Sequence, residues 1–323
     1  VLDHHYGRTD ADTTLAVAAA LEEVGLRGKV ARGMAGPYTE LARRQGLPES
    51  AFPMSADEEL AITDECMRAR PKGSKIEIWS GPINTVYTDQ ELLAASVELA
   101  RSHGVGWHTH VSAPQSDPGV YLEAYGVRPV MWLDSRGLLG PDAVLAHATW
   151  LDESEIEAFG ETRTAVVHCP LSNQYVPYGV MPMRLLRHAG ATVGLGSDGS
   201  ACGHRQDLFE NMKLLVLMHR LHHLDPKATF APEALELATV GGAAAHGIDA
   251  GVLKPGSLAD VIVVDASRPH MAPFHRPTSG IVYSARASDV EMNIIGGEIV
   301  VEDGRCTLVD QDRIISEAKK KGD

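Results

Sequence analysis

Four short apolar runs of this sequence end in a histidine or an aspartate, and these are the residues whose types and spacing could do chemistry. The runs close at His110, His147, His168 and Asp198. Imidazole nitrogens and carboxylate oxygens are the ligands that hydrolytic Zn2+ or Fe2+ sites use. In a parallel barrel the carboxyl ends of the strands meet at one rim. We therefore expect these four side chains to lie near each other and to form a metal-dependent hydrolytic site.

Helical and extended patterns alternate through the first part of the chain and must position these residues. Residues 89–103, for example, carry apolar side chains on one helical face before a Gly turn and the strand that contains His110. Seven such strand-to-helix units can be counted, without an internal repeat. The alternation predicts an α/β fold, a β/α barrel over residues 1–249.

The pattern changes after residue 249, where short strands and turns predict a small β-domain over residues 250–310. The strands are expected at 261–264, 281–284, 290–295 and 298–302, and Gly296-Gly297 predicts a tight hairpin between the last two. Residues 311–323 are expected to form a C-terminal helix that ends in a lysine run.

Composition excludes several functional classes. The 323 residues are 44% hydrophobic, enough for a large core, and carry a net charge of −14, which argues against partners such as nucleic acid or an anionic membrane. No apolar run approaches the roughly 20 residues that span a bilayer. The four cysteines lie far apart without a Cys-x-x-Cys pair, and no signal-peptide pattern is seen. We expect reduced thiols and a cytoplasmic location.

Several motifs together resemble the amidohydrolase superfamily, and within it the aminohydrolase branch. That branch includes the methylthioadenosine/S-adenosylhomocysteine deaminases, 8-oxoguanine deaminases, pterin deaminases and s-triazine hydrolases. The resemblance covers nearly the whole chain. It is carried by the segments His108-Thr109-His110, Leu145-Ala146-His147, His168-Cys169-Pro170-Leu171-Ser172-Asn173, Gly196-Ser197-Asp198-Gly199, Ala238-Thr239-Val240-Gly241-Gly242, Leu253-Lys254-Pro255-Gly256 and Gly296-Gly297-Glu298.

The resemblance implies a TIM-like (β/α)8 barrel with a small β-sandwich and one bound metal ion, usually Zn2+, with Fe2+ or Mn2+ as alternatives. It implies that His110, His147 and Asp198 hold the metal, and that His147 and Asp198 are also catalytic. His168 and Asn173 would lie at the rim near the substrate.

Two further residues are predicted to bind the substrate, on the strand before the one that carries His110. Trp79 is expected to lie at a strand end, where its indole could stack on a planar heterocycle; core packing is the alternative. Asn84 follows Gly81-Pro82-Ile83, where the thioadenosine deaminases show Gly-Pro-His. This difference argues against a nucleoside substrate.

Two other departures from the family pattern concern the metal and the proton donor. The His-x-His pair of the first barrel strand is absent, since the chain opens on Val1-Leu2-Asp3-His4-His5 where the second strand is expected. We therefore expect a truncated chain that lacks the first barrel strand and half of the sandwich. Many relatives carry a glutamate where this chain has Ala113, which we interpret as the mark of a different substrate subgroup.

Three functions remain open at this point. The first is hydrolytic deamination of an amino-substituted N-heterocycle, such as a purine, pterin or triazine. The second uses the same site to displace chloride or an alkylamine from a triazine-like ring. The third is a metal-free barrel that acts as a subunit or scaffold, which metal analysis of the purified protein would detect. A small heterocyclic molecule is the expected partner, and a homodimer is possible.

Overall fold

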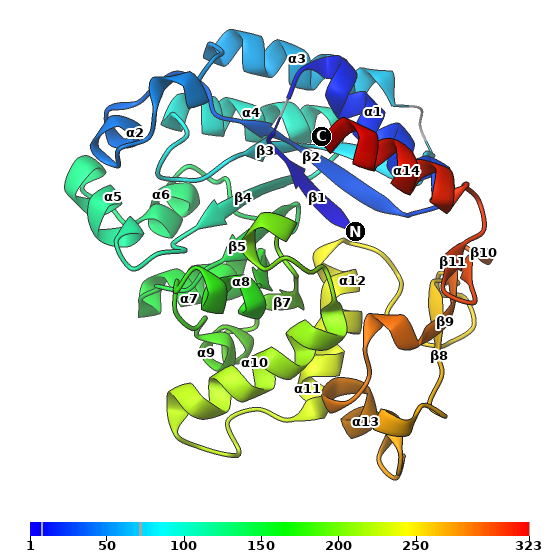
Figure 1. Cartoon of the computed structure of the whole chain (residues 1–323). Coiled ribbons are helices and arrows are strands. Elements are labelled where there is room, and N and C mark those ends of the chain that lie inside the picture. The colour runs from blue at the N-terminus through cyan, green and yellow to red at the C-terminus, as the bar shows by residue number, and fades with distance from the viewer. Residues whose placement is uncertain (8, 71–72, 323) are drawn as a thin grey trace.

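Seven parallel strands form one curved sheet, in which each strand pairs with the next one along the chain (Figure 1). The computed structural model describes residues 1–7, 9–70 and 73–322. The strands are β1 (Leu2–His5), β2 (Gly28–Met34), β3 (Ile76–Pro82), β4 (Trp107–Val111), β5 (Ala143–His147), β6 (Ala165–His168) and β7 (Thr192–Leu195). Their carboxyl ends share one rim because every pairing is parallel. The prediction of a TIM-like barrel is confirmed, with seven strands curled into a half-barrel.

Helices connect the strands and cover the outside of the sheet (Figure 1). They are α1 (Ala11–Glu23), α2 (Glu40–Arg44), α3 (Ala56–Ala69), α4 (Gln90–His103), α5 (Asp117–Tyr125), α6 (Pro129–Ser135), α7 (Glu153–Thr162), α8 (Pro170–Tyr175), α9 (Met183–His188), α10 (Leu208–His223), α11 (Ala231–Glu236) and α12 (Gly242–Ala245). Short polar side chains begin many of them. Asp89 accepts hydrogen bonds from the amides at the start of α4, and Gly104 ends that helix in the left-handed conformation.

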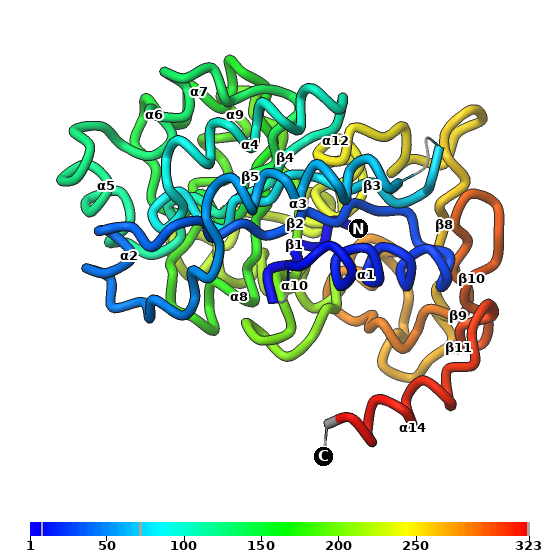
Figure 2. Tube along the Cα trace, turned by 90° about the horizontal axis from the view of Figure 1, so that it is seen from above, coloured from blue at the N-terminus to red at the C-terminus, as the bar shows by residue number. Residues whose placement is uncertain are grey.

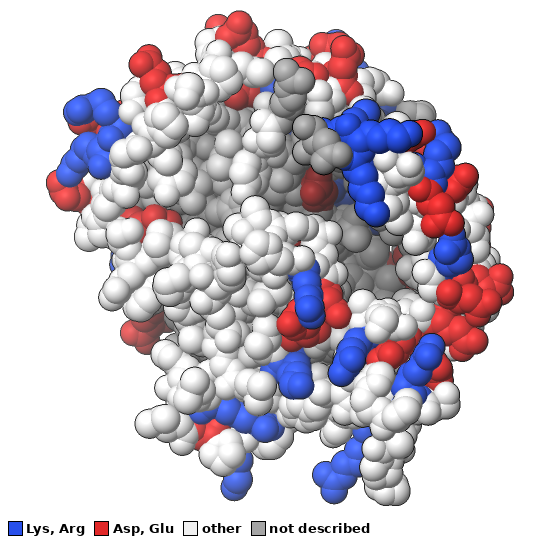
Figure 3. All heavy atoms as spheres, in the orientation of Figure 1, with Lys and Arg blue, Asp and Glu red and all other residues white. Residues whose placement is uncertain are grey.

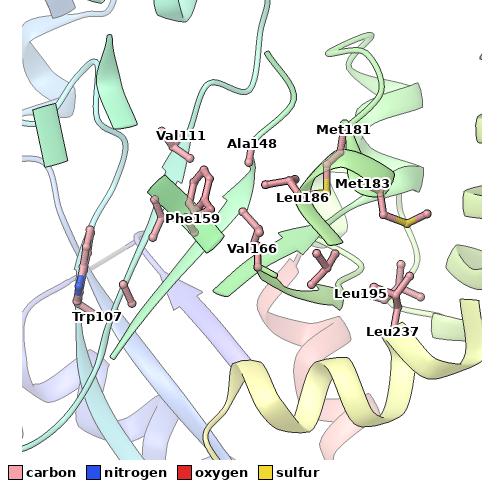
Figure 4. Packing of buried hydrophobic residues seen from close by; sticks show 14 of the residues in the cluster. Trp107, Val111, Ala148, Phe159, Val166, Met181, Met183, Leu186, Leu195 and Leu237 are labelled. Atoms are coloured by element: carbon pink, nitrogen blue, oxygen red, sulfur yellow. The ribbon is translucent and has the colours of Figure 1, made fainter. Parts of the chain in front are cut away.

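Apolar side chains fill both faces of the sheet. Figure 4 shows Phe159 of α7 beside Val111 and Val166 of the strands, in the large cluster between sheet and helices. A smaller cluster fills the inner face and contains Ala31, Trp79, Val144, Ala165 and Ala245. The two clusters use alternate residues of the same strands, as β-strand geometry requires.

A run of helix from α11 to α12 packs against β7, and its middle, Leu237–Gly241, is a π-helical turn. A Cβ atom on Gly241 would lie 2.2 Å from the carbonyl oxygen of Val193 in β7. Glycine is therefore required for the helix to rest directly on the strand backbone.

The C-terminal part contains a separate antiparallel sheet of four strands, in the order β11-β10-β9-β8. The strands are β8 (Val261–Val264), β9 (Val290–Ile295), β10 (Glu298–Glu302) and β11 (Arg305–Cys306). Gly296 and Gly297 both have positive φ, which fits the predicted hairpin. Within the described residues this unit is one sheet, without a second sheet facing it, and α14 (Gln311–Gly322) follows it. Figure 2 shows α14 projecting from the β11 side of the molecule.

The strand predicted at residues 281–284 was wrong, because this segment belongs to the helix α13 (Pro277–Tyr283). Pro277 lies in the first helical turn, where its fixed φ favours a helix and no backbone donor is lost. Val282 is buried while Ile281 and Tyr283 are only half-buried, so the apolar residues serve one helical face and not a strand.

Charged side chains of both signs are scattered over the face seen in Figure 3, and the basic group over the end of α14 includes Lys319, Lys320 and Lys321. Among the described residues, no helix combines the length and the apolar character that crossing a bilayer would need.

Candidate metal-dependent active site

The carboxyl ends of β4, β5 and β7 bring His110, His147 and Asp198 together, as the sequence predicted. The ring centroids of His110 and His147 lie 5.3 Å apart, with the rings stacked. Nε2 of His147 lies 3.8 Å from Oδ2 of Asp198. Whether these three residues bind a metal stays a prediction, but their side chains share one space at the rim.

His147 and Asp198 both adopt the left-handed backbone conformation, with φ of 71° and 62°. This conformation costs an L-residue other than glycine roughly 1–2 kcal/mol. Such residues cluster at functional sites, where the surrounding structure holds them in place. The turns after β5 and β7 therefore aim these two side chains at each other at a cost in stability.

Hydrogen bonds fix which nitrogen of each imidazole is free. Nδ1 of His110 donates to the carbonyl oxygen of Ile83 at 2.7 Å, and Nδ1 of His147 donates to Oδ1 of Asn173 at 2.9 Å. Both rings thus keep their Nε2 lone pair for another partner. Burial, and then the neighbouring His110, lower the pKa of His147 to about 4, although Asp198 acts in the opposite direction. His147 is therefore neutral at pH 7, as a metal-binding imidazole must be.

The carboxylate of Asp198 is held from two sides. The hydroxyl of Ser172 donates to Oδ2, and the backbone amide of Gly199 donates to Oδ1 at 2.7 Å.

Two tyrosines lie near these residues. The ring of Tyr178 lies 5.3 Å from that of His147 in an edge-to-face arrangement. Burial first, and then the charge of Asp198, raise the pKa of Tyr6, so the Tyr6 phenol stays protonated at neutral pH.

Two histidines that the sequence reasoning did not assign to the site, His4 and His108, lie beside His110. One nitrogen of each of these three rings falls within 4.8 Å of the other two. His108 could have been found from the sequence, since strand alternation places it on the same face as His110. His4 was passed over because Asp3-His4-His5 does not match the family pattern. These two residues extend the set of imidazoles along the rim to β1.

The donor set suits a divalent ion of intermediate softness. Imidazole nitrogens with one carboxylate are preferred by Zn2+ and by Fe2+, whereas Mg2+ and Ca2+ prefer oxygen. Nδ1 of His4 is buried and has no hydrogen-bond partner. A buried imidazole nitrogen without a partner in the protein is in the environment that a metal ligand requires. The residues present therefore fit the metal that the resemblance implies.

His168 points away from this site. It shares a face of β6 with the core residue Val166, and its Nε2 lies 3.2 Å from Nε2 of His219 on α10. Both rings are completely buried. The expectation that His168 lies at the rim near the substrate was wrong, because strand alternation turns it toward the helical layer.

Trp79 is likewise placed away from the predicted position, since it is the fourth of the seven residues of β3 and does not end the strand. Its indole nitrogen donates to Glu77, and the ammonium group of Lys29 lies 4.5 Å from the ring centroid. The side chain is 5% exposed and belongs to the inner cluster. Core packing, the alternative considered for it, accounts for these contacts.

Asn84 and Asn173 lie at the rim but are already engaged by the protein. Asn84 pairs with His110 in an isolated parallel bridge, and its Oδ1 accepts the backbone amide of Val86 at 2.7 Å. Asn173 orients His147, as described above, and is 1% exposed. Both residues therefore support the histidines of the site, whereas substrate contact by either one stays a prediction.

The position where many relatives carry a glutamate is occupied by Ala113, which is buried. The carboxyl group of Asp117 lies next to it and accepts a hydrogen bond from the backbone amide of Ala113. Oδ2 of Asp117 is buried without a partner. Burial raises the pKa of Asp117 to about 7, so a large fraction of the carboxyl groups carries a proton at neutral pH.

Residues 1–300 match the family described as the Amidohydrolase family. The chain belongs to the amidohydrolase family. A 5-methylthioadenosine/S-adenosylhomocysteine deaminase of Pelotomaculum thermopropionicum is 37% identical over 306 residues, which cover 94% of this chain and 68% of that protein. A 5'-deoxyadenosine deaminase of Methanosarcina mazei is 36% identical over 303 residues, which cover 94% of this chain and 68% of that protein.

Solved structures of the amidohydrolase fold agree with this assignment. The zinc-bound adenosine deaminase of Xanthomonas campestris superimposes with a TM-score of 0.85 at 25% identity, over 99% of this chain and 70% of that one. The atrazine chlorohydrolase of Arthrobacter aurescens, complexed with zinc, superimposes with a TM-score of 0.89 at 26% identity, over 99% of this chain and 71% of that one.

Proposed function

We propose that this amidohydrolase catalyses the hydrolytic deamination of an amino-substituted N-heterocycle with the help of a divalent metal ion. The observation that carries the proposal is the convergence of His110, His147 and Asp198, in which the free Nε2 of His147 faces the carboxylate and the ring of His110 stacks on that of His147. These three residues would hold the metal. Zinc is the first candidate because two similar solved structures contain it, and Fe2+ or Mn2+ are alternatives.

The reaction adds water to the ring carbon that bears the amino group. A C–O bond forms, the C–N bond breaks, and the products are ammonia and the ring with a carbonyl or hydroxyl group in place of the amine. A bound Zn2+ lowers the pKa of water from about 15.7 to about 7 and so supplies hydroxide at neutral pH.

Asp198 and His147 would handle the attacking water. The carboxylate of Asp198 has a fixed orientation, through Ser172 and the amide of Gly199, and would take the proton. His147 has its tautomer fixed by Asn173, which leaves its Nε2 lone pair to hold the metal beside the attacking water. Proton transfer by a positioned side chain is typically worth about 10²–10⁴ in rate.

Asp117 would donate the proton to the ring nitrogen in place of the family glutamate. Its support is the contact with the Ala113 amide, the unpartnered Oδ2 and the pKa of about 7. Ser112, which precedes Ala113, is also buried with an unpartnered hydroxyl, but an alcohol is a far weaker acid. We expect Ala113→Glu to change the substrate profile, and an unchanged profile and rate would contradict the interpretation of Ala113.

An adenine-type purine is the first substrate class to test, because the two similar deaminases are named for adenosine derivatives. Ile83, in place of the histidine of the thioadenosine deaminases, argues against a nucleoside and therefore for a purine base that does not need that contact. The structural similarity to atrazine chlorohydrolase favours displacement of chloride or an alkylamine as the second candidate.

The experiment is an assay of the zinc-loaded protein on a panel of adenosine derivatives, pterins, aminotriazines and chlorotriazines. Ammonia, chloride and alkylamine are measured separately. Release of ammonia from one amino-substituted class is expected. Chloride or alkylamine release alone would favour the second candidate, and a folded chain with less than about 0.2 metal per chain after loading would favour the scaffold.

We also propose the division into residues 1–249, 250–310 and 311–323, and a cytoplasmic location. The cytoplasmic location is supported by the four cysteines, which are all free. Cytoplasmic proteins keep their thiols reduced.

A further inference from the structure

We propose that His4 of β1 and His108 of β4 join His110 in binding the divalent cation, so that a cluster of three imidazoles adds to the ligands His147 and Asp198. The inference deepens the proposed function, because it names ligands of the ion on which that function rests. The family resemblance places no ligand at His4 or at His108. The argument for them comes from the geometry and hydrogen bonding of these two side chains.

The three rings occupy one small space. One nitrogen from each ring lies within 4.8 Å of the other two. Nitrogens bound to a common ion at about 2.0–2.1 Å lie no more than about 4.2 Å apart. Small rotations of the side chains would therefore bring all three to ligand distance. Backbone placement supports this, since His4 pairs with the inner-face residue Ala31 in the sheet.

Each ring also shows the hydrogen bond that is typical of a metal-bound histidine. Nε2 of His4 donates to the carbonyl oxygen of Gly81 at 3.0 Å, and Nδ1 of His108 donates to that of Val144 at 2.7 Å. His110 donates in the same way to a backbone carbonyl, as described above. A carbonyl oxygen only accepts, so the proton of each ring is fixed on that nitrogen and the other nitrogen has a free lone pair.

Ring packing alone does not account for this arrangement. The rings of His4 and His110 are stacked at 4.9 Å, and those of His4 and His108 meet edge to face at 4.8 Å. Packed neutral rings would explain these contacts. They would leave Nδ1 of His4 buried without a partner, whereas a cation satisfies it.

Three imidazoles select a particular class of ion. Imidazole nitrogen binds Zn2+, Co2+, Ni2+ and Cu2+, whereas Mg2+ and Ca2+ prefer oxygen ligands. His110 contacts the other two rings of the cluster and also stacks on His147, which lies beside Asp198. A cation held by the cluster would therefore lie next to the groups proposed to handle water.

The test is Co2+ binding to the metal-free full chain. Equilibrium dialysis measures the affinity, and visible absorption reports the coordination of the bound Co2+. His4→Gln and His108→Gln are compared with His5→Gln, the neighbouring histidine that strand alternation places on the other face of β1. We expect the first two variants to weaken Co2+ binding at least tenfold and to change its spectrum. His5→Gln is expected to leave both as in the wild type.

Unchanged Co2+ affinity and spectrum in His4→Gln and His108→Gln would overturn the inference. The proposed function would survive that result if ammonia release persists and if Asp198→Asn weakens Co2+ binding instead. Nitrogen NMR of wild-type chain labelled with 15N-histidine avoids the risk that a variant does not fold. Zn2+ should shift one nitrogen of each of the three rings, and shifts absent from His4 and His108 would also contradict the inference.

Discussion

His147 and Asp198 face each other across the ends of β5 and β7, with 3.8 Å between Nε2 of the imidazole and Oδ2 of the carboxylate. Both residues have a left-handed backbone, and each is held by a neighbour from α8, Asn173 for the imidazole and Ser172 for the carboxylate. One short helix therefore orients both side chains. This pair is the part of the site in which the proposed proton transfer takes place.

Replacing Asp198 by Asn should remove the proton acceptor while leaving the fold intact. The amide oxygen of Asn can still accept the hydrogen bond of the Gly199 amide, and its NH2 group can donate to the Ser172 hydroxyl, so stability should change little. We expect the rate of ammonia release to fall at least 100-fold. Asp303→Asn is the matched control, because Asp303 also has a positive φ but lies exposed in a surface turn. Equal rates in the two variants would remove Asp198 from the chemistry.

Asp117 should make the chain less stable as the pH rises. Burial raises its pKa from 3.8 to about 7, so the folded state holds this proton more tightly than the unfolded state. The contribution of Asp117 to the stability of the folded state is therefore most favourable below about pH 4, and it is lost as the pH rises from about 4 to 7. Asp117→Asn should therefore gain stability over the wild type by up to about 1.4 kcal/mol per pH unit in that window. Urea unfolding of the wild type and of Asp117→Asn at several pH values measures this effect. A difference in unfolding free energy between the two that does not vary with pH would contradict the burial of a titrating carboxyl.

The buried pair of His168 and His219 should have the opposite pH dependence. Burial, then His223 and His222, lower the pKa of His219 from 6.5 to about 4. Below pH 6.5 the unfolded chain takes up the proton first, so stability falls as the pH drops from about 6.5 to 4. His219→Gln should reduce the slope of unfolding free energy against pH by up to about 1.4 kcal/mol per unit. An unchanged slope would show that His219 does not titrate differently in the two states.

Glu59 should be essential for the loop that follows β2. Its carboxylate lies 2.8 Å from the guanidinium of Arg32, and both side chains are almost completely buried. It also accepts the backbone amides of Ala35 and Gly36. Removing one partner of a buried ion pair typically costs about 3–5 kcal/mol, and we expect Glu59→Gln to cost this much in urea unfolding. Glu123→Gln breaks the exposed pair with Arg44 and should change the free energy of unfolding far less than Glu59→Gln does.

The strand ends could be predicted from the sequence because each apolar run is short and stops at a polar residue. This placed His110, His147 and Asp198 correctly at one rim. The same reasoning placed His168 wrongly, since the end of a strand does not tell toward which face its last side chain points. Counting from Val166, which faces the helices, would have given the answer.

Contacts between distant segments could not be predicted in this way. His4 lies on a strand of four residues, too short to show a pattern, and only the pairing of β1 with β2 fixes its face. Trp79 was misplaced because β3 continues through Gly81 to Pro82, two residues that usually end a strand. The segment at 281–284 is rich in strand-forming residues, but Pro277 and packing on α10 and α11 make it helical.

The most direct measurement is an anomalous-scattering map, recorded at the zinc absorption edge, from a crystal of the full chain soaked in Zn2+. We predict a single strong peak at the ends of β4 and β5, about 2.0–2.2 Å from Nε2 of His110 and next to Asp198. A crystal with these side chains ordered and no zinc peak within reach of His110 would contradict the metal-dependent site.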